Sequence, residues 1–236
     1  PMGIRNNRYT VEVPTVVEPV QRSGSIHAKE AEFLRNNTKK KIKFTLPGPM
    51  TICDTIANDC YRTRSQMAYE FASILNEEAK DLEKIGVDII QFDEPAFNSF
   101  TKETLDWGID TLEKAVEGLK CTTAVHICYG YGIQENINWK KTLGDNWNQY
   151  QKIFPVLNKS SLNQVSLEFA GSKVPPSLMQ LLPDKELMVG VITVVANNLE
   201  TPEEVKNNIL SSLKYVDYER LIPCSNCGMA PLPEKI

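Results

Sequence analysis

Residues 87–97 read VDIIQFDEPAF, a short apolar run that ends in two carboxylates, and this pattern decides the fold. The run at 87–92 is almost continuously hydrophobic, which is typical of a parallel strand covered on both faces. Five further runs of the same kind lie at residues 42–46, 122–128, 164–169, 187–193 and 220–223. The sequence therefore predicts a sheet of parallel strands.

Amphipathic segments separate these runs. Residues 63–85 place apolar side chains on one stripe, and Gly86 follows where a helix can end in a left-handed residue. Residues 201–204, TPEE, read as a helix start with Thr201 as N-cap, Pro at the first position and Glu at the third. Strand and helix alternate six times, so the sequence predicts an α/β fold.

The arrangement of polar residues distinguishes a barrel from an open sheet. The G-x-G-x-x-G turn of a dinucleotide-binding sheet is missing from the sequence. Polar residues instead follow the predicted strands, at Asp93, at His126 and Cys128, at Glu168 and at Cys227. Because strand ends of this kind converge at the mouth of a barrel, we predict a (β/α)8 TIM-barrel type fold. About six βα units are visible, so we expect a truncated barrel that lacks the first two units and the last helix.

We expect residues 1–236 to form a single domain. Residues 41–236 carry the alternating strands and helices, whereas residues 1–40 do not resemble a further pair of βα units. Residues 9–20, YTVEVPTVVEPV, are β-branched and interrupted by proline, so we expect an extended antiparallel hairpin over the barrel mouth.

Composition excludes several classes of protein. The 236 residues are 42% hydrophobic and 24% charged, with a net charge of −4, which gives no reason to expect nucleic acid or a membrane as partner. No apolar run approaches the roughly 20 residues that cross a bilayer. Six cysteines without an export signal indicate reduced or metal-binding thiols in the cytoplasm.

His126 and Cys128 lie on one face of their predicted strand, because side chains alternate with period two. Imidazole and thiolate are ligands that zinc prefers, although a core histidine beside a buried cysteine has the same pattern. Glu168 ends another buried strand, where a carboxylate is either paired with a cation or bound to a metal. With Cys227, these residues form a four-ligand set that predicts zinc.

Two neighbouring motifs have more than one interpretation. Cys224 and Cys227 form a C-x-x-C, but no second C-x-x-C completes a zinc knuckle, and a redox pair normally opens a helix early in a fold. Asp93 and Glu94 point to opposite faces if the strand continues, so we expect one of them to line the mouth. That acid could bind a substrate ammonium group or act as a general base, whereas Asp93 could also cap a helix.

Five motifs occur here in one order: LPGPMT (46–51), IIQFDEPAF (89–97), HICYGYG (126–132), SLE (166–168) and CSNCGMAP (224–231). Together they closely resemble the catalytic domain of cobalamin-independent methionine synthase, and above all its short "core" relatives. The resemblance runs from about residue 9 to the end of the chain.

The resemblance implies a zinc-dependent methyltransferase that forms L-methionine by moving a methyl group to the thiol of L-homocysteine. It implies His126, Cys128, Glu168 and Cys227 as zinc ligands, with Asp93 holding the amino group of homocysteine. The methyl donor would be a methylfolate or a methylcorrinoid.

The chain departs from the family at Val195, which stands where the folate-dependent enzymes carry a proton-donating histidine. Valine cannot donate a proton, so the catalytic acid is unknown and methyltetrahydrofolate is expected to be a poor donor. The family barrel also begins with two units that this chain lacks. We therefore expect a second copy or another protein to cover the open barrel edges.

Two alternatives belong to other classes. One is a non-catalytic remnant in which zinc is structural. The other is a metal-free barrel enzyme similar to uroporphyrinogen decarboxylase, which has no use for the four-ligand set. Activity separates the first alternative from the enzyme, and metal content separates the second.

Overall fold

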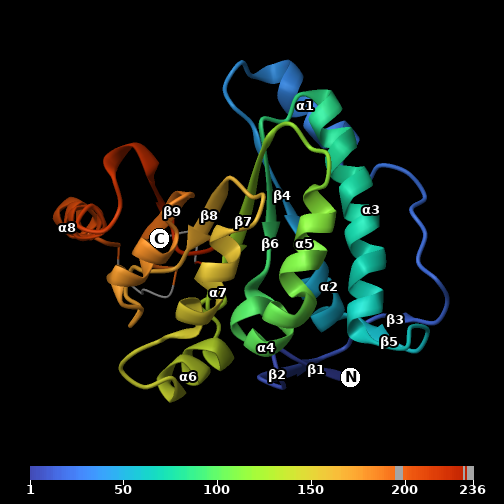
Figure 1. Ribbon diagram of the computed structural model, residues 1–236, viewed down its shortest axis with the longest axis horizontal. Helices are drawn as coiled ribbons and strands as arrows, with labels where there is room; N and C mark the ends of the chain where they lie inside the picture. Colours follow the sequence, from blue (N-terminus) through green and yellow to red (C-terminus); the bar gives the residue numbers. More distant parts are fainter. Residues whose placement is uncertain (195–198, 231, 233–236) are drawn as a thin grey trace. The chain divides into compact units, whose positions relative to one another are not determined.

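The computed structural model describes residues 1–194, 199–230 and 232 (Figure 1). It contains two compact units, Pro1–His126 with Ser160–Asn163, and Ile127–Lys159 with Gln164–Ile236. A single domain over residues 1–236 stays a prediction.

The first unit holds three parallel strands, β4 (Lys43–Pro47), β6 (Ile89–Asp93) and β7 (Thr122–Ile127), in the order β4-β6-β7; the last residue of β7 begins the second unit. The register aligns Pro47 with Asp93, and Asp93 with His126. Because the carboxyl ends of the three strands are level, the residues that follow them meet at one edge.

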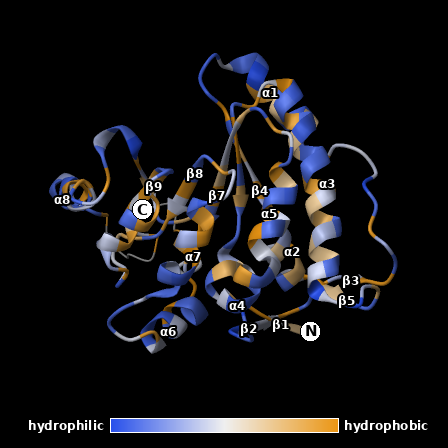
Figure 2. Ribbon diagram, in the orientation of Figure 1, coloured by the Kyte–Doolittle hydropathy of each residue, from blue (hydrophilic) through white to orange (hydrophobic). Residues whose placement is uncertain are grey.

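Helices flank these strands in the first unit. They are α1 (Ala28–Asn37), α2 (Pro49–Thr55), α3 (Arg64–Ile85), α4 (Thr101–Glu103) and α5 (Ile109–Val116), with the short turns η1 (Pro95–Asn98) and η2 (Thr104–Gly108). Figure 1 shows α3 and α5 side by side, and they pack together. Figure 2 shows that α3 mixes hydrophilic and hydrophobic residues, as expected for a helix with one buried stripe.

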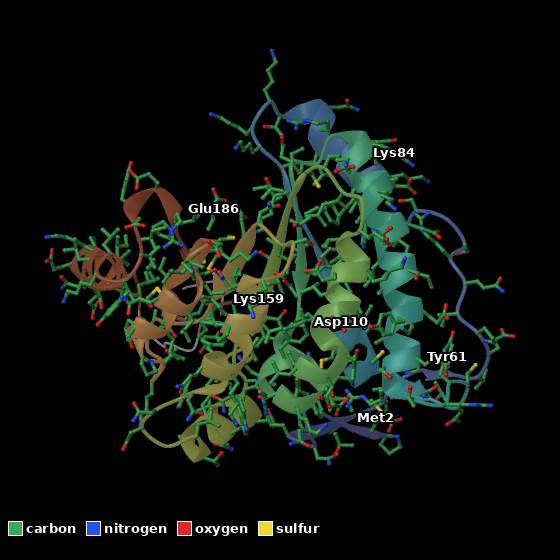
Figure 3. All side chains as sticks on the ribbon, in the orientation of Figure 1. Met2, Tyr61, Lys84, Asp110, Lys159 and Glu186 are labelled. Atoms are coloured by element: carbon green, nitrogen blue, oxygen red, sulfur yellow. The ribbon has the colours of Figure 1, made fainter. Side chains whose placement is uncertain are left out.

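The predicted bounds of α3 are confirmed, and its caps explain them. The Thr63 side chain accepts a hydrogen bond from the Gln66 amide at 3.1 Å, and Gly86 ends the helix with φ of 99°. Tyr61 and Lys84 mark the two ends of the helix in Figure 3.

The N-terminal segment differs from the prediction. A hairpin exists, but it joins β1 (Met2–Ile4) to β2 (Tyr9–Val11) through a turn with positive φ at residues 5–7, where asparagine is tolerated. Further along the chain, β3 (Thr15–Val16) pairs in parallel with β5 (Ala57–Asn58), so the expected hairpin within residues 9–20 is wrong. Helix α1 was also not predicted, because it is polar and its periodicity is weak.

In its described residues, the second unit holds three parallel strands, β8 (Gln164–Leu167), β9 (Glu186–Ile192) and β10 (Leu221–Ser225), in the order β8-β9-β10. Its helices are α6 (Gln134–Thr142), α7 (Gln149–Asn158) and α8 (Pro202–Ser212), with the short turns η3 (Pro176–Leu181) and η4 (Tyr218–Arg220). Thr201 and Glu204 form the capping box that starts α8, as the sequence predicted.

All six predicted strands are present and pair in parallel within their units, which confirms the α/β class. The strand interiors are buried, for example Phe92, Val125 and Val165 at 0% exposure, so the continuous apolar runs are explained by cover on both faces. Among the described residues, no helix is long and apolar enough to cross a membrane.

Glu78 of α3 hydrogen-bonds to the segment that precedes α1. Its buried carboxylate accepts hydrogen bonds from the Ile26 and His27 amides, from the Ser25 hydroxyl and from Arg22. Burial raises the pKa of this carboxyl, but the Arg22 guanidinium and the backbone donors outweigh burial and leave the pKa below its usual value. This extended segment is thus held to α3 by Glu78 and, through Arg22, by Asp81.

We predict that Glu78→Ala lowers the free energy of unfolding by about 2 to 3 kcal/mol, because it leaves two amides and the Ser25 hydroxyl without their acceptor, while Arg22 keeps its bond to Asp81. The neighbouring Glu77→Ala is the matched control. Glu77 lies 3.8 Å from Arg22 and its side chain is 61% exposed, so its loss should cost less than about 1 kcal/mol. Equal effects of the two substitutions in urea denaturation would contradict this account.

Candidate metal centre

Three of the four predicted ligands lie at strand ends and are buried. His126 lies in β7 and Cys128 directly follows that strand, while Cys227 comes two residues after the end of β10. Their exposures are 7%, 2% and 8%, respectively. The predicted positions of these residues at strand ends are therefore correct.

The ligand atoms of His126, Cys128 and Cys227 all lie within 4.8 Å of one another. The two sulfur atoms are 3.5 Å apart, and the Gly130 amide donates a hydrogen bond to Cys128 Sγ at 3.3 Å. Val194 packs against both thiols on the apolar side. The structure thus brings together one imidazole and two thiols from distant parts of the chain.

Glu168 follows β8 and is 2% exposed. Its Oε2 accepts a hydrogen bond from the Tyr129 amide at 2.8 Å, and its Oε1 accepts one from Lys140 Nζ at 2.6 Å. The ion pair considered as an alternative is therefore present. The carboxylate is held beside the residue that follows Cys128, outside the group formed by His126, Cys128 and Cys227. Metal ligation by Glu168 stays a prediction.

Cys224 lies inside β10, in register with Gly190 of β9, and is half-buried. It does not belong to the group formed by His126, Cys128 and Cys227. All six cysteines lie in the described part of the chain, and each is a thiol outside any disulfide. The C-x-x-C motif is thus not an oxidised redox pair in this structure.

The hydroxyl of Tyr150 joins the ends of two strands next to the candidate ligands. It donates a hydrogen bond to the Ile127 carbonyl at 2.6 Å and accepts one from the Glu168 amide at 3.2 Å. Burial raises the pKa of this hydroxyl well above its ordinary value, so it remains a donor. The backbone that carries Cys128 is therefore tied to the backbone that carries Glu168.

Asn226 makes a second tie, between the Cys227 loop and the residues after Glu168. Its Oδ1 accepts hydrogen bonds from the Phe169 and Ala170 amides, both at 3.1 Å, and its Nδ2 donates to the Ala170 carbonyl at 2.6 Å. The side chain is fully buried, and a Cβ on Gly190 would lie 2.0 Å from its Oδ1. Glycine at position 190 thus leaves the space that Asn226 occupies.

Asp93 and Glu94 have separate surroundings, as the sequence predicted. Asp93 is half-buried and accepts a hydrogen bond from Gln91 Nε2 at 2.8 Å; burial raises its pKa. Its register partner across the ladder is His126. Asp93 does not cap a helix, because η1 begins after Glu94 and has no side-chain cap.

Glu94 is fully buried and receives the start of α2. It accepts hydrogen bonds from the Met50 and Thr51 amides, both at 2.9 Å, and from the Thr51 hydroxyl at 2.7 Å. A Cβ on Gly48 would lie 2.2 Å from the carboxyl carbon of Glu94, so the LPGPMT loop needs glycine here. Burial raises the pKa of Glu94 to about 7.

Sequence reasoning did not identify Lys140, Tyr150 and Asn226 as parts of this centre. Lys140 reads as one of two surface lysines near the end of a helix, and Tyr150 as a core aromatic. Asn226 lies between Cys224 and Cys227, whose thiols are candidates for metal ligands or a redox pair. Val195, where the family histidine was expected, lies outside the described residues.

The donor set itself indicates which ion the centre fits. One imidazole nitrogen and two thiolate sulfurs suit a borderline-soft dication and do not suit Mg²⁺ or Ca²⁺, which prefer oxygen. All three groups are buried, and two buried thiolates would need the positive charge of a metal to compensate them. The centre is thus a candidate His/Cys metal site at strand ends of an α/β fold.

A family model described as "Cobalamin-independent synthase, Catalytic domain" matches residues 5–235, and the chain belongs to this family. A methionine synthase of Saccharolobus islandicus (strain Y.G.57.14 / Yellowstone #1) is 31% identical over 228 residues, covering 94% of this chain and 62% of the relative. A methionine synthase of Sulfolobus acidocaldarius is 29% identical over 224 residues, again with 94% of this chain and 60% of the relative. The chain thus spans about three fifths of the length of these curated relatives.

Solved structures agree with the family. A B12-independent methionine synthase from Shewanella sp. W3-18-1, in complex with selenomethionine, superposes with a TM-score of 0.97 at 55% identity, covering 99% of this chain and 68% of that chain. A protein from Listeria monocytogenes described as a vitamin-B12 independent methionine synthase has the same fold, with a TM-score of 0.71 at 16% identity, covering 92% of this chain and 67% of that chain. The TIM-barrel type fold expected from the sequence is confirmed by these matches.

We predict a pH-dependent effect of Glu94→Gln. The carboxyl pKa rises from 4.5 to about 7 on folding, so its contribution to stability is fully present below pH 4.5 and is lost as the pH rises through 7. Relative to Glu94→Gln, the wild type should therefore lose about 3 kcal/mol of unfolding free energy between pH 4.5 and pH 8. Urea titrations at several pH values measure this difference, and a constant difference would contradict the assigned pKa.

Proposed function

We propose that this chain is the metal-binding part of a zinc-dependent methyltransferase that transfers a methyl group to the thiol of L-homocysteine and forms L-methionine. The observation that carries the proposal is the buried group of His126, Cys128 and Cys227, whose ligand atoms lie within 4.8 Å of one another. Family membership supplies the reaction class. Glu168 is proposed as the fourth ligand because it is anchored to the amide of Tyr129, one residue after Cys128.

Zinc, when bound, would lower the pKa of the homocysteine thiol and act as the Lewis acid that orients it. The chain's own residues would hold the substrate. Asp93 is half-buried at the end of β6 and in register with His126, so its carboxylate is positioned to accept hydrogen bonds from a substrate ammonium group. Gln91 fixes one oxygen of that carboxylate.

The Shewanella relative supports this substrate class. It was solved with selenomethionine, which is methionine with selenium in place of sulfur and therefore resembles the proposed product. That relative is 55% identical to this chain over nearly its whole length. We propose that the same class of amino acid binds here.

The proposed metal assignment predicts that Cys227→Ala loses stoichiometric zinc, because three remaining ligands hold the ion far less tightly. Cys224→Ala is the matched control. It removes a thiol three residues away that lies outside the group, so it should keep the wild-type zinc content. Metal analysis of the purified variants measures both, and the reverse result would make Cys224 the ligand.

We also predict that methyltetrahydrofolate is a poor donor. A positioned general acid contributes about 10²- to 10⁴-fold in rate, and Val195 cannot supply the proton that a departing pteridine nitrogen needs. When a methylcorrinoid is the donor, the demethylated corrinoid departs without needing a proton. This donor should therefore turn over at least about 100-fold faster. The assay is methionine formation by the zinc-loaded chain with each donor.

Comparable rates with the two donors would contradict the role assigned to Val195. Zinc binding without homocysteine binding or turnover would instead favour a non-catalytic remnant with a structural ion. The metal-free alternative similar to uroporphyrinogen decarboxylase gains no support from the family match.

A further inference from the structure

Lys140 is a buried cation next to the candidate metal centre. The residue is 8% exposed, although lysine is almost always exposed unless it is paired. Its Nζ donates a hydrogen bond to Glu168 Oε1 at 2.6 Å and another to the Gly130 carbonyl at 3.3 Å. The ammonium group also lies 5.9 Å from the ring centre of Trp147. The position of this cation is therefore fixed from several sides.

Glu168 is oriented by two different donors, one for each oxygen. The Tyr129 amide donates a hydrogen bond to Oε2 and Lys140 donates one to Oε1, so each oxygen of the carboxylate has its own donor. Tyr129 is part of the backbone next to Cys128, whereas Lys140 belongs to helix α6. The orientation of Glu168 thus depends on one side chain that is distant from the ligands in sequence.

The charges of the centre require a further positive group. Two thiolates and one carboxylate exceed a zinc dication by one negative charge. A net charge buried in a protein interior is costly unless an opposite charge lies close to it. Lys140 supplies that charge at hydrogen-bond distance from Glu168, with side-chain exposures of 9% and 3%.

We propose that Lys140 is a positioning residue of the metal centre, which orients the Glu168 carboxylate toward the ion and balances the charge of the occupied site. The proposal rests on the proposed zinc function. Residues that hydrogen-bond to a metal ligand commonly change the affinity for the metal by about 10- to 100-fold when they are lost. Lys140 itself does not contact the ion or the substrate in this role.

The test measures zinc affinity by competition with a chromophoric chelator, on the full chain. Lys140→Met should weaken zinc binding by about 10- to 100-fold, the usual effect of losing an outer partner of a ligand. Lys141→Met is the matched control, because Lys141 is the next residue of the same helix and is exposed. It should leave the affinity unchanged, and Lys140→Arg should recover part of the loss.

A double-mutant cycle separates positioning from general stability. If Lys140 acts through Glu168, then Lys140→Met should have almost no further effect on zinc affinity in a Glu168→Gln background. Wild-type affinity in the single variant, or the same loss in both backgrounds, would overturn the proposal. If Lys140→Met does not fold, Lys140→Gln takes its place in the cycle, because its amide can still donate a hydrogen bond to Glu168 but carries no charge.

Failure of the proposed function has a different signature. In that case the wild-type chain itself would bind no zinc, and none of the variants could change the affinity. Zinc binding by the wild type with no effect of Lys140→Met would leave the metal site intact and refute only the role of Lys140.

Discussion

The parallel pairing of the strands is the constraint on which the centre depends. In a parallel ladder, all carboxyl ends lie at the same edge, and residues that follow the strands share that edge. Within the first unit this brings Asp93 beside His126, and within the second it places the carboxyl ends of β8 and β10 level with the carboxyl end of β9, which lies between them. Antiparallel pairing of any one strand would move its terminal residue to the opposite edge.

Parallel pairing brings the strand ends close together, and hydrogen bonds from buried side chains to backbone groups then hold the segments that follow the strands. Tyr150 ties the end of β7 to Glu168, and Asn226 ties the Cys227 loop to the residues after β8. Each is buried, so losing its partners would leave polar groups unsatisfied in the interior. The loops that carry the proposed metal ligands are thereby hydrogen-bonded to neighbouring backbone.

The sequence predicted the parts of this structure that follow from local pattern. Continuous apolar runs located all six strands, and cap residues such as Thr63 and Gly86 located the ends of α3. His126, Cys128 and Cys227 were found because thiols and imidazole are chemically distinctive. The hairpin was misplaced, because the turn at residues 5–7 depends on asparagine in a conformation that periodicity does not report.

Lys140, Tyr150 and Asn226 could not be found in this way, since their importance comes from contacts between segments distant in sequence. A lysine near the end of a polar helix looks exposed until the fold places a carboxylate next to it. The same holds for Glu94, whose bonds to the start of α2 link residues more than forty positions apart. Pairings at this range are set by topology and not by local composition.

The separation of the two thiols along the chain has a thermodynamic consequence. Cys128 and Cys227 are 99 residues apart in sequence, while their sulfur atoms lie 3.5 Å apart. An ion bound to both would close a loop of that length and would restrict the unfolded chain as a covalent cross-link does, by about 4 to 5 kcal/mol in the chain-entropy account. Such an ion would stabilise the folded state by cross-linking nearly half of the polypeptide, in addition to any part it takes in chemistry.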